Sequence, residues 1–208
     1  MALKKGDLIL FQGDSITDCG RSREDLTDLG PGYPHLVAAS LGALRSEQEL
    51  RFLNRAISGN RTSCLLDRWS EDCIELRPAL LSILVGINDV WHREKGIGNT
   101  DAELKANYTA LLTRVREELG DIPVVMLEPF LTPDSVVNIK REEVDSVRAI
   151  VRGLAERFGA TFVPLDAPLA AASEAFPPHA LTKEGVHPTE QGHAIIAKHW
   201  LDAVLPLL

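Results

Sequence analysis

Residues 8–18 read Leu-Ile-Leu-Phe-Gln-Gly-Asp-Ser-Ile-Thr-Asp, an apolar run that passes directly into a polar turn. The run is almost continuously apolar rather than alternating, which is typical of a strand buried on both faces of a parallel sheet. Runs of this kind occur at 8–12, 50–57, 80–85, 124–127 and 161–165. The sequence therefore predicts a parallel sheet of five strands, whose first strand leads into the polar turn.

Amphipathic stretches separate these runs and predict helices. The clearest is 101–119, where apolar residues recur with a period near 3.6 and Gly120 follows as the helix-ending residue. Further helices are predicted at 35–44, 63–76, 141–158 and 188–205, the last with Pro188 at a favoured first position. Alternating strands and helices indicate an α/β fold. No linker or repeat divides the chain, so we expect one domain over residues 1–208.

The composition favours an ordinary globular protein. The chain has 208 residues, 45% of them hydrophobic, and 22 Lys+Arg against 30 Asp+Glu give a net charge of −8. This acidic balance argues against a nucleic-acid partner, because phosphate binding needs clustered basic side chains. No apolar run approaches the roughly 20 residues of a membrane span, so no membrane partner is expected. Three cysteines without metal-site spacing, and no signal-peptide pattern, predict a cytoplasmic protein.

Four residues that can take part in catalysis follow the first three predicted strands or precede the last predicted helix. They are Ser15, Gly59, Asn88 and His187. In open parallel sheets, ligands bind at the carboxyl ends of the strands, so we expect these residues to converge. A hydroxyl, an exposed backbone N–H, a carboxamide and an imidazole are the groups that acyl transfer requires.

Four blocks of this chain resemble the GDSL/SGNH hydrolase family. They are Gly13-Asp14-Ser15, the later Gly59, Gly86-Ile87-Asn88-Asp89, and His187 with an acid three residues before it. Residues flanking these blocks are most similar to the carbohydrate acetylesterase branch, which includes acetyl-xylooligosaccharide esterases. The resemblance implies a flavodoxin-like three-layer α/β/α sandwich. It also implies a serine esterase, without cofactor, that removes acetyl groups from small carbohydrates through an acetyl-Ser15 intermediate.

The resemblance assigns a role to each of these residues. Ser15 is the nucleophile and His187 the base that takes its proton, because a free hydroxyl is a weak nucleophile at neutral pH. The backbone N–H groups of Ser15 and Gly59 and the side-chain amide of Asn88 form the oxyanion hole. Such preorganised donors typically contribute about 10²–10³ each to kcat.

The acid of the site departs from the family pattern. The usual residue three positions before the histidine is aspartate, whereas this chain has Glu184, which is longer by one methylene. Three hypotheses are open. Glu184 serves as the acid, which we favour; another carboxylate such as Asp166 replaces it; or Ser15 and His187 form a dyad whose ring is oriented by a backbone carbonyl.

Three residues are candidates for the substrate pocket. Trp91 follows Asn88 closely, and a pocket role and a packing role are equally favoured for it. Tyr33 and Arg61 are weaker candidates, for which a packed or solvated role is the stronger alternative. No histidine pair has metalloenzyme spacing, so no catalytic metal is expected. Cys19 is interpreted as a small buried or edge residue.

Other activities compete with the acetylesterase hypothesis. Lysophospholipases, thioesterases and aryl esterases also occur in the family, so the fold does not settle the substrate. The mixed polar segments 91–95 and 129–139 favour a short acyl group and a polar alcohol. A non-catalytic sugar-binding relative is the alternative if Glu184 disarms the site, whereas a nucleotide-binding Rossmann protein is disfavoured because its glycine pattern is missing. We expect a small-molecule ester substrate, and we favour a homo-oligomer because related enzymes often assemble.

Overall fold

The computed structural model describes residues 3–208 and contains a five-stranded parallel sheet. Its strands are β1 (Leu8–Gly13), β2 (Arg51–Asn54), β3 (Leu80–Leu84), β4 (Val124–Leu127) and β5 (Thr161–Val163). They lie in the order β2-β1-β3-β4-β5, which is the flavodoxin-like order. The predicted parallel α/β architecture is confirmed. The order reverses beside β1, so the carboxyl ends of β1, β2 and β3 meet at one edge.

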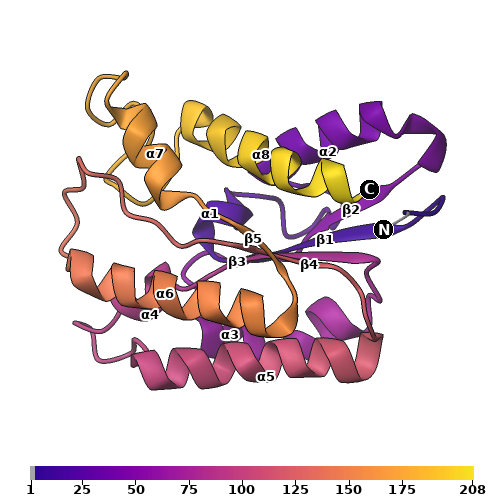
Figure 1. Cartoon of the computed structure of the whole chain (residues 1–208), viewed down its shortest axis with the longest axis horizontal. Helices are drawn as coiled ribbons and strands as arrows, with labels where there is room; N and C mark the ends of the chain where they lie inside the picture. The colour runs from indigo at the N-terminus through magenta and orange to yellow at the C-terminus, as the bar shows by residue number, and fades with distance from the viewer. Residues whose placement is uncertain (1–2) are drawn as a thin grey trace.

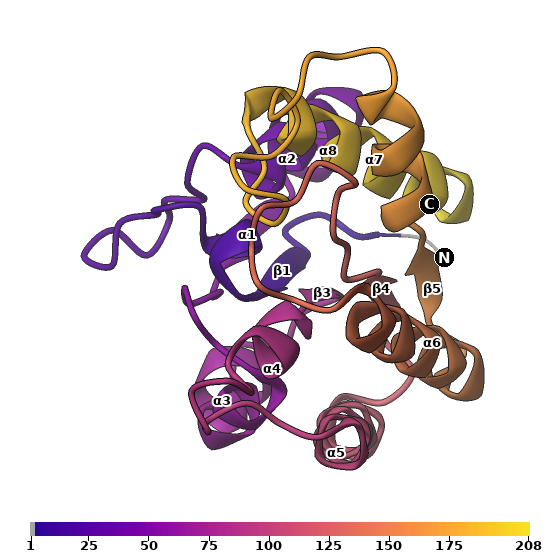
Figure 2. The same ribbon diagram turned by 90° about the vertical axis from the view of Figure 1, so that its left-hand side faces the viewer.

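Helices cover both faces of the sheet and make a three-layer sandwich (Figures 1 and 2). On one face lie α2 (Tyr33–Leu44), α7 (Asp166–Ser173) and α8 (Glu190–Val204). On the other lie α3 (Thr62–Asp67), α4 (Ile87–Trp91), α5 (Asp101–Leu119) and α6 (Arg141–Phe158). Short turns occupy α1 (Ser15–Asp18), Ser46–Gln48, Ser70–Ile74 and Leu205–Leu207. None of the helices in the described part of the chain is long and apolar enough to cross a membrane.

The apolar strand β1 divides the core between the two helical layers. Ile9 and Phe11 join the cluster formed with α2 and α8, whereas Leu10 joins the cluster formed with α3, α5 and α6. Successive side chains of a strand point to opposite faces, so both faces of β1 are apolar. A strand buried in this way is a rigid base for the polar turn that follows it.

The two longest helices have the predicted ends because their capping residues are clear in the sequence. Thr100 caps α5 by accepting from the Glu103 N–H, and the Glu103 side chain bonds back to the Thr100 N–H. Gly120 follows α5, and Gly159 ends α6 in the left-handed region at φ +62°.

Several predicted elements are shorter in the structure than expected, and the strand predicted at 161–165 already ends at Val163. The strand predicted at 50–57 ends at Asn54, whose side chain donates to the carbonyl oxygens of Thr17 and Leu29 and accepts from the Ala56 N–H. These bonds turn the chain toward the end of β1. The helix predicted at 63–76 is divided into α3 and a π-helical turn at Ser70–Ile74.

The last helix begins two residues later than predicted. Thr189 is its N-cap and accepts from the Gly192 N–H at 3.3 Å, so Glu190 is the first helical residue. Pro188 is instead paired with Thr182 in an isolated antiparallel bridge. His187 therefore belongs to the loop that precedes α8 and not to the helix.

Candidate active site

Ser15 is placed by a tight turn directly after β1. At Gly13, a Cβ atom would lie 2.3 Å from the Leu84 carbonyl oxygen, so only glycine fits where β1 approaches β3. Asp14 then caps the short helix α1, because its carboxylate accepts from the Ile16 N–H at 3.0 Å. Ser15 is the first residue of α1, and its side chain faces a cavity of about 720 Å³.

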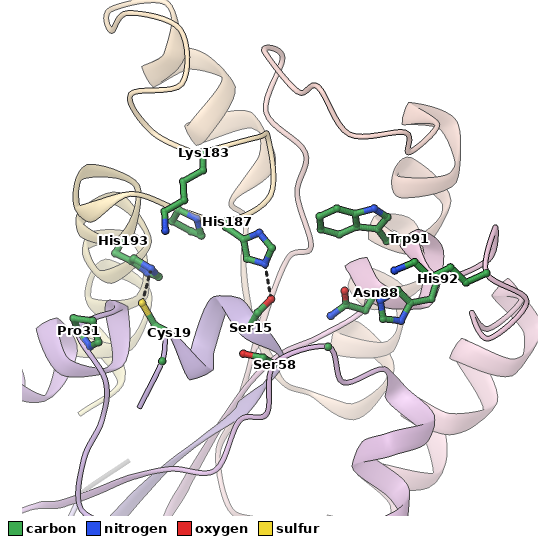
Figure 3. Close-up of a pocket in the computed structure, with 14 residues that line it drawn as sticks. Ser15, Cys19, Pro31, Ser58, Asn88, Trp91, His92, Lys183, His187 and His193 are labelled. Atoms are coloured by element: carbon green, nitrogen blue, oxygen red, sulfur yellow. Dashed lines mark hydrogen bonds between the residues drawn. The ribbon is translucent and has the colours of Figure 1, made fainter. Parts of the chain in front are cut away.

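Ser15, His187 and Glu184 form a continuous chain of hydrogen bonds. The Ser15 Oγ lies 2.8 Å from the His187 Nε2, and the His187 Nδ1 lies 2.5 Å from Oε1 of Glu184 (Figure 3). A carboxylate only accepts hydrogen bonds, so Nδ1 carries the proton and Nε2 is free to accept from the serine hydroxyl. This tautomer is the one that a general base requires.

A short loop fixes Glu184 and His187 relative to each other. The Lys183 N–H donates to the His187 carbonyl oxygen at 2.8 Å, which closes the loop, and the Glu184 carbonyl accepts from the Val136 N–H at 3.1 Å. Gly185 has φ +109°, and a Cβ there would lie 2.4 Å from Ser135. The loop therefore packs tightly against the segment after β4, and this packing restricts where the Glu184 side chain can lie.

Asp166, the alternative acid of the sequence analysis, lies elsewhere. Its side chain is buried, accepts from the Leu131 N–H at 3.2 Å and forms ion pairs with Arg141 and Arg148 at 2.6 and 3.3 Å. Asp166 is thus bonded to arginines and the backbone. The ring nitrogen Nδ1 of His187 is bonded to Glu184 and not to Asp166.

The three predicted oxyanion donors line the same cavity. Gly59 sits in a turn closed by the Asn60 N–H bonding to the Ile57 carbonyl, and its φ of +80° requires glycine. Within residues 3–208, the N–H groups of Ser15 and Gly59 donate to no other residue. The Asn88 side chain donates one amide hydrogen to the Asn60 carbonyl oxygen at 3.1 Å, which leaves the second for a ligand.

Asp89 holds the elements that carry these donors together. Its buried carboxylate accepts from the backbone N–H and the hydroxyl of Thr62, the latter at 2.6 Å, and from the Asn99 amide at 2.6 Å. These bonds link the start of α3 and the loop before α5 to α4, which carries Asn88. Thr62 and Asn99 lie 27 and 10 positions from Asp89, so no local motif in the sequence indicates this positioning role.

A model of the GDSL-like lipase/acylhydrolase family matches residues 11–195. This chain belongs to that family. The acetylxylan esterase of Geobacillus stearothermophilus is 32% identical over 212 residues, which cover 97% of this chain and 95% of that protein. As a member of this family with such a relative, the chain is a carboxylic ester hydrolase.

Solved structures of similar proteins confirm the fold of this GDSL-like hydrolase. The structure of the Geobacillus acetylxylan esterase matches with a TM-score of 0.87 at 31% identity, covering 98% of this chain and 96% of that one. A Parabacteroides merdae structure described as a GDSL-like lipase matches with a TM-score of 0.92 at 36% identity, covering 97% of each chain.

The three candidate pocket residues of the hydrolase have different positions. Trp91 lines the cavity, with its ring centroid 5.8 Å from that of His187 (Figure 3). Tyr33 is fully buried, and its hydroxyl lies 3.0 Å from the Thr17 Oγ1. Arg61 donates to the Ile97 carbonyl oxygen, away from the cavity lining. The structure thus places Trp91 at the site and the other two outside it.

A second histidine of the hydrolase, His193, lies at the cavity wall, and no motif in the sequence indicates it. His193 Nδ1 accepts from the Tyr33 N–H at 3.2 Å, so its Nε2 carries the proton and lies 3.3 Å from the Cys19 sulfur. Burial, with a smaller effect of Lys183, lowers the pKa of His193 to about 4. Neutral His193 therefore donates a hydrogen bond to Cys19. The two residues are 174 positions apart, so no local motif pairs them.

The pKa of Asp14, the residue directly before Ser15, is also shifted. Asp14 is fully buried, its Oδ2 has no hydrogen-bond partner in the described part of the chain, and burial raises its pKa to about 7. The Ile16 N–H only partly offsets this effect. No group of three or more His, Cys, Asp or Glu side chains able to hold a metal ion occurs among residues 3–208.

Proposed function

We propose that this hydrolase removes acetyl groups from small carbohydrates, such as acetylated xylooligosaccharides, through an acetyl-Ser15 intermediate. The observation that carries the proposal is the Ser15–His187–Glu184 hydrogen-bond chain at a cavity that Gly59 and Asn88 also line. The acetyl preference is supported by the similarity to an acetylxylan esterase.

In the acylation step, the Ser15 oxygen attacks the carbonyl carbon of the ester while His187 Nε2 takes the hydroxyl proton. The negative oxygen of the tetrahedral intermediate is bound by the N–H groups of Ser15 and Gly59 and by the Asn88 amide. Collapse breaks the bond to the alcohol oxygen, which receives the proton from His187. The products of this step are the free alcohol and acetyl-Ser15.

In the deacylation step, water replaces the alcohol. His187 Nε2 takes a proton from the water as its oxygen attacks the acetyl carbonyl, and the same donors bind the second oxyanion. The proton then returns to the Ser15 oxygen, and acetate leaves. Glu184 stabilises the imidazolium that forms in both steps and keeps the ring in one orientation.

Glu184 is the best-supported acid of the proposed triad. Its carboxylate is the group bonded to His187 Nδ1, while Asp166 is paired with arginines. Catalytic mutants of the Geobacillus esterase replace a serine, an aspartate and a histidine by alanine, and that aspartate stands three positions before the histidine. Glu184 has the same spacing from His187, so the two acids correspond.

The lining of the cavity favours a short acyl group. Among the described residues, it includes serine, cysteine, glycine, proline, asparagine, histidine and lysine side chains and the aromatic Trp91, but no leucine, isoleucine, valine, phenylalanine or methionine. A long acyl chain needs an apolar groove to leave water, whereas an acetyl group does not. The hydroxyl, amide and imidazole groups in this lining can form hydrogen bonds with the hydroxyl groups of a carbohydrate.

The test is hydrolysis of p-nitrophenyl acetate, butyrate and octanoate by the wild type and Ser15→Ala. We expect acetate to be the best substrate, acetylated xylooligosaccharides to be deacetylated, and Ser15→Ala to be inactive. A preference for octanoate would instead support a lysophospholipase-like activity. Absence of turnover in both proteins, without labelling by a fluorophosphonate, would support a sugar-binding relative.

The domain, assembly and location of the protein stay predictions. The family match over residues 11–195 and the single described sheet support one hydrolase domain. Light scattering after size-exclusion chromatography tests the homo-oligomer, and cell fractionation tests the cytoplasmic location.

A further inference from the structure

Two lysines stand in the lining of the active-site cavity, although the protein as a whole is acidic. Lys183 and Lys95 line this cavity, and no aspartate or glutamate does so among the described residues. The whole chain has a net charge of −8, so this local charge is opposite to that of the surface as a whole. The neighbouring carboxylates are bonded to other residues and do not pair with these lysines. Glu184 is bonded to His187, and buried Asp18 is bonded to Arg23 and Ser58.

Neither lysine is neutralised by a partner. Within residues 3–208, the ammonium groups of Lys183 and Lys95 form no ion pair or side-chain hydrogen bond, whereas Lys198 on α8 is paired with Asp202 at 2.6 Å. Their charges act on the cavity wall. Lys183 lowers the pKa of His193, in addition to the larger effect of burial, and Lys95 does the same to His92. Both cations are thus available to a bound anion.

Lys183 is fixed to the side of the cavity where the alcohol leaves. Its backbone N–H bonds to the His187 carbonyl oxygen at 2.8 Å, so it belongs to the same closed loop as the proposed base. Figure 3 shows its side chain on the side of Ser15 where Cys19 and His193 lie, across from Asn88. The carbonyl oxygen of a substrate lies toward Asn88, and His187 protonates the alcohol, so Lys183 stands near the alcohol portion.

We propose that the alcohol portion of the substrate is an acidic sugar, whose carboxylate or phosphate is bound by Lys183, with Lys95 as a second, weaker contributor. The proposal rests on the esterase function proposed above. An acetyl group carries no charge, so an anionic group can only belong to the alcohol. An ammonium group binds either oxyanion as a compact point charge. In the Geobacillus esterase, a tryptophan stands directly before the catalytic aspartate, where this chain has Lys183 before Glu184.

The experiment compares two substrates that differ only in one charge. They are an O-acetylated methyl glucuronoside with a free carboxylate and the same compound as its neutral carboxyl methyl ester, with release of acetate as the readout. We expect kcat/KM to be about 2- to 5-fold higher for the carboxylate, as for an ion pair with an exposed lysine. Rising salt should lower this ratio, because screening weakens the attraction. An O-acetylated sugar phosphate, measured in parallel, distinguishes the phosphate from the carboxylate source.

Single lysine substitutions show which residue causes the difference in kcat/KM between the two substrates. Lys183→Gln should bring the ratio of the two kcat/KM values close to one, Lys183→Arg should keep it, and Lys95→Gln should lower it less. Lys198→Gln removes the same charge outside the cavity and should leave the ratio unchanged. The two substrates are compared within each variant. A change in the catalytic step itself therefore alters both kcat/KM values equally and leaves their ratio unchanged.

Two results would overturn the proposal. Equal kcat/KM for the charged and neutral esters in the wild type would show that no anion is recognised. An equal loss of the ratio in Lys183→Gln and Lys198→Gln would assign the effect to overall charge. In both cases acetate release still supports the esterase function, whereas failure of every acetyl ester to react would refute that function itself.

Discussion

Oε1 of Glu184 accepts two hydrogen bonds from one residue, from the ring Nδ1 of His187 at 2.5 Å and from its backbone N–H at 2.9 Å. The side chain therefore folds back over the loop, and the extra methylene of glutamate is accommodated within the turn. A single oxygen thus fixes both the backbone and the ring of the proposed base. The first prediction follows from this double contact.

Replacing Glu184 by glutamine should lower kcat by about 10²–10⁴-fold and change KM only a few-fold, because the amide supplies no charge to stabilise the imidazolium. Glu184→Asp keeps the charge and should retain more activity. Steady-state kinetics on p-nitrophenyl acetate measures both variants. Unchanged turnover in Glu184→Gln would support the dyad, and a strong loss in Asp166→Asn alone would support the other acid.

Asn88→Ala should lower kcat by about 10²–10³-fold, since one oxyanion donor is lost while the ground-state ester binds as before. Asn138→Ala is the matched control, because Asn138 is exposed and lies outside the cavity lining. The same kinetic assay compares the two. Equal activities would remove Asn88 from the oxyanion hole.

Asp14→Asn should change how stability depends on pH. The native pKa of Asp14 is raised to about 7, whereas an unfolded aspartate has a pKa of about 3.9. At a pH below both pKa values, Asp14 is protonated in the folded and the unfolded state, and its contribution to the free energy of unfolding is fully present. As the pH rises toward 7, only the unfolded state releases this proton, so the free energy of unfolding falls, and it falls no further once the native group ionises.

The asparagine side chain is neutral at every pH and keeps the oxygen that caps α1. Between pH 5 and pH 7, the wild type should therefore lose on the order of 2 kcal/mol more stability than Asp14→Asn. Urea unfolding at both pH values measures this difference. Parallel pH profiles of the two proteins would contradict the assignment of a protonated Asp14.

Gly185→Ala should destabilise the protein and reduce activity. The new Cβ would lie 2.4 Å from Ser135 Cβ in a backbone conformation, φ +109°, that other residues rarely adopt. Relief of this clash must move the loop that carries Glu184 and His187. Gly153→Ala is the control, because a Cβ at Gly153 on α6 meets no atom within 4 Å. Comparable melting temperatures and kcat for the two variants would contradict this prediction.

Much of the fold could be predicted because the sequence marks it locally. The bounds of α5 and α6 depend on Thr100, Gly120 and Gly159, whose effects act within a few residues. The end of β2 depends instead on contacts of Asn54 with Thr17 and Leu29, which lie far from it in the sequence. Propensity patterns do not contain such contacts, so the predicted strand 50–57 extends beyond the observed end of β2 at Asn54.

The same distinction applies to the site. Ser15, Gly59, Asn88 and His187 belong to recognisable motifs, and the structure brings all of them to one cavity. Tyr33 is a weaker pocket candidate for which a packed role is the stronger alternative, and its ring packs 5.9 Å from that of Phe11 in the core. His193 reaches the cavity through the packing of α8, so no spacing in the sequence identifies it. Lys183 and Cys19 stand close in sequence to Glu184 and Ser15, but they belong to no motif that marks them as cavity residues.

The nucleophile and its base stand 172 positions apart, near the two ends of the chain. Ser15 follows the first strand, and His187 precedes the final helix, so the pair can form only after α8 has packed beside α2. A chain in which α8 has not docked against α2 therefore has a serine hydroxyl without its base. Loss of ester hydrolysis should thus reveal any change that separates α8 from α2, even where the sheet itself stays folded.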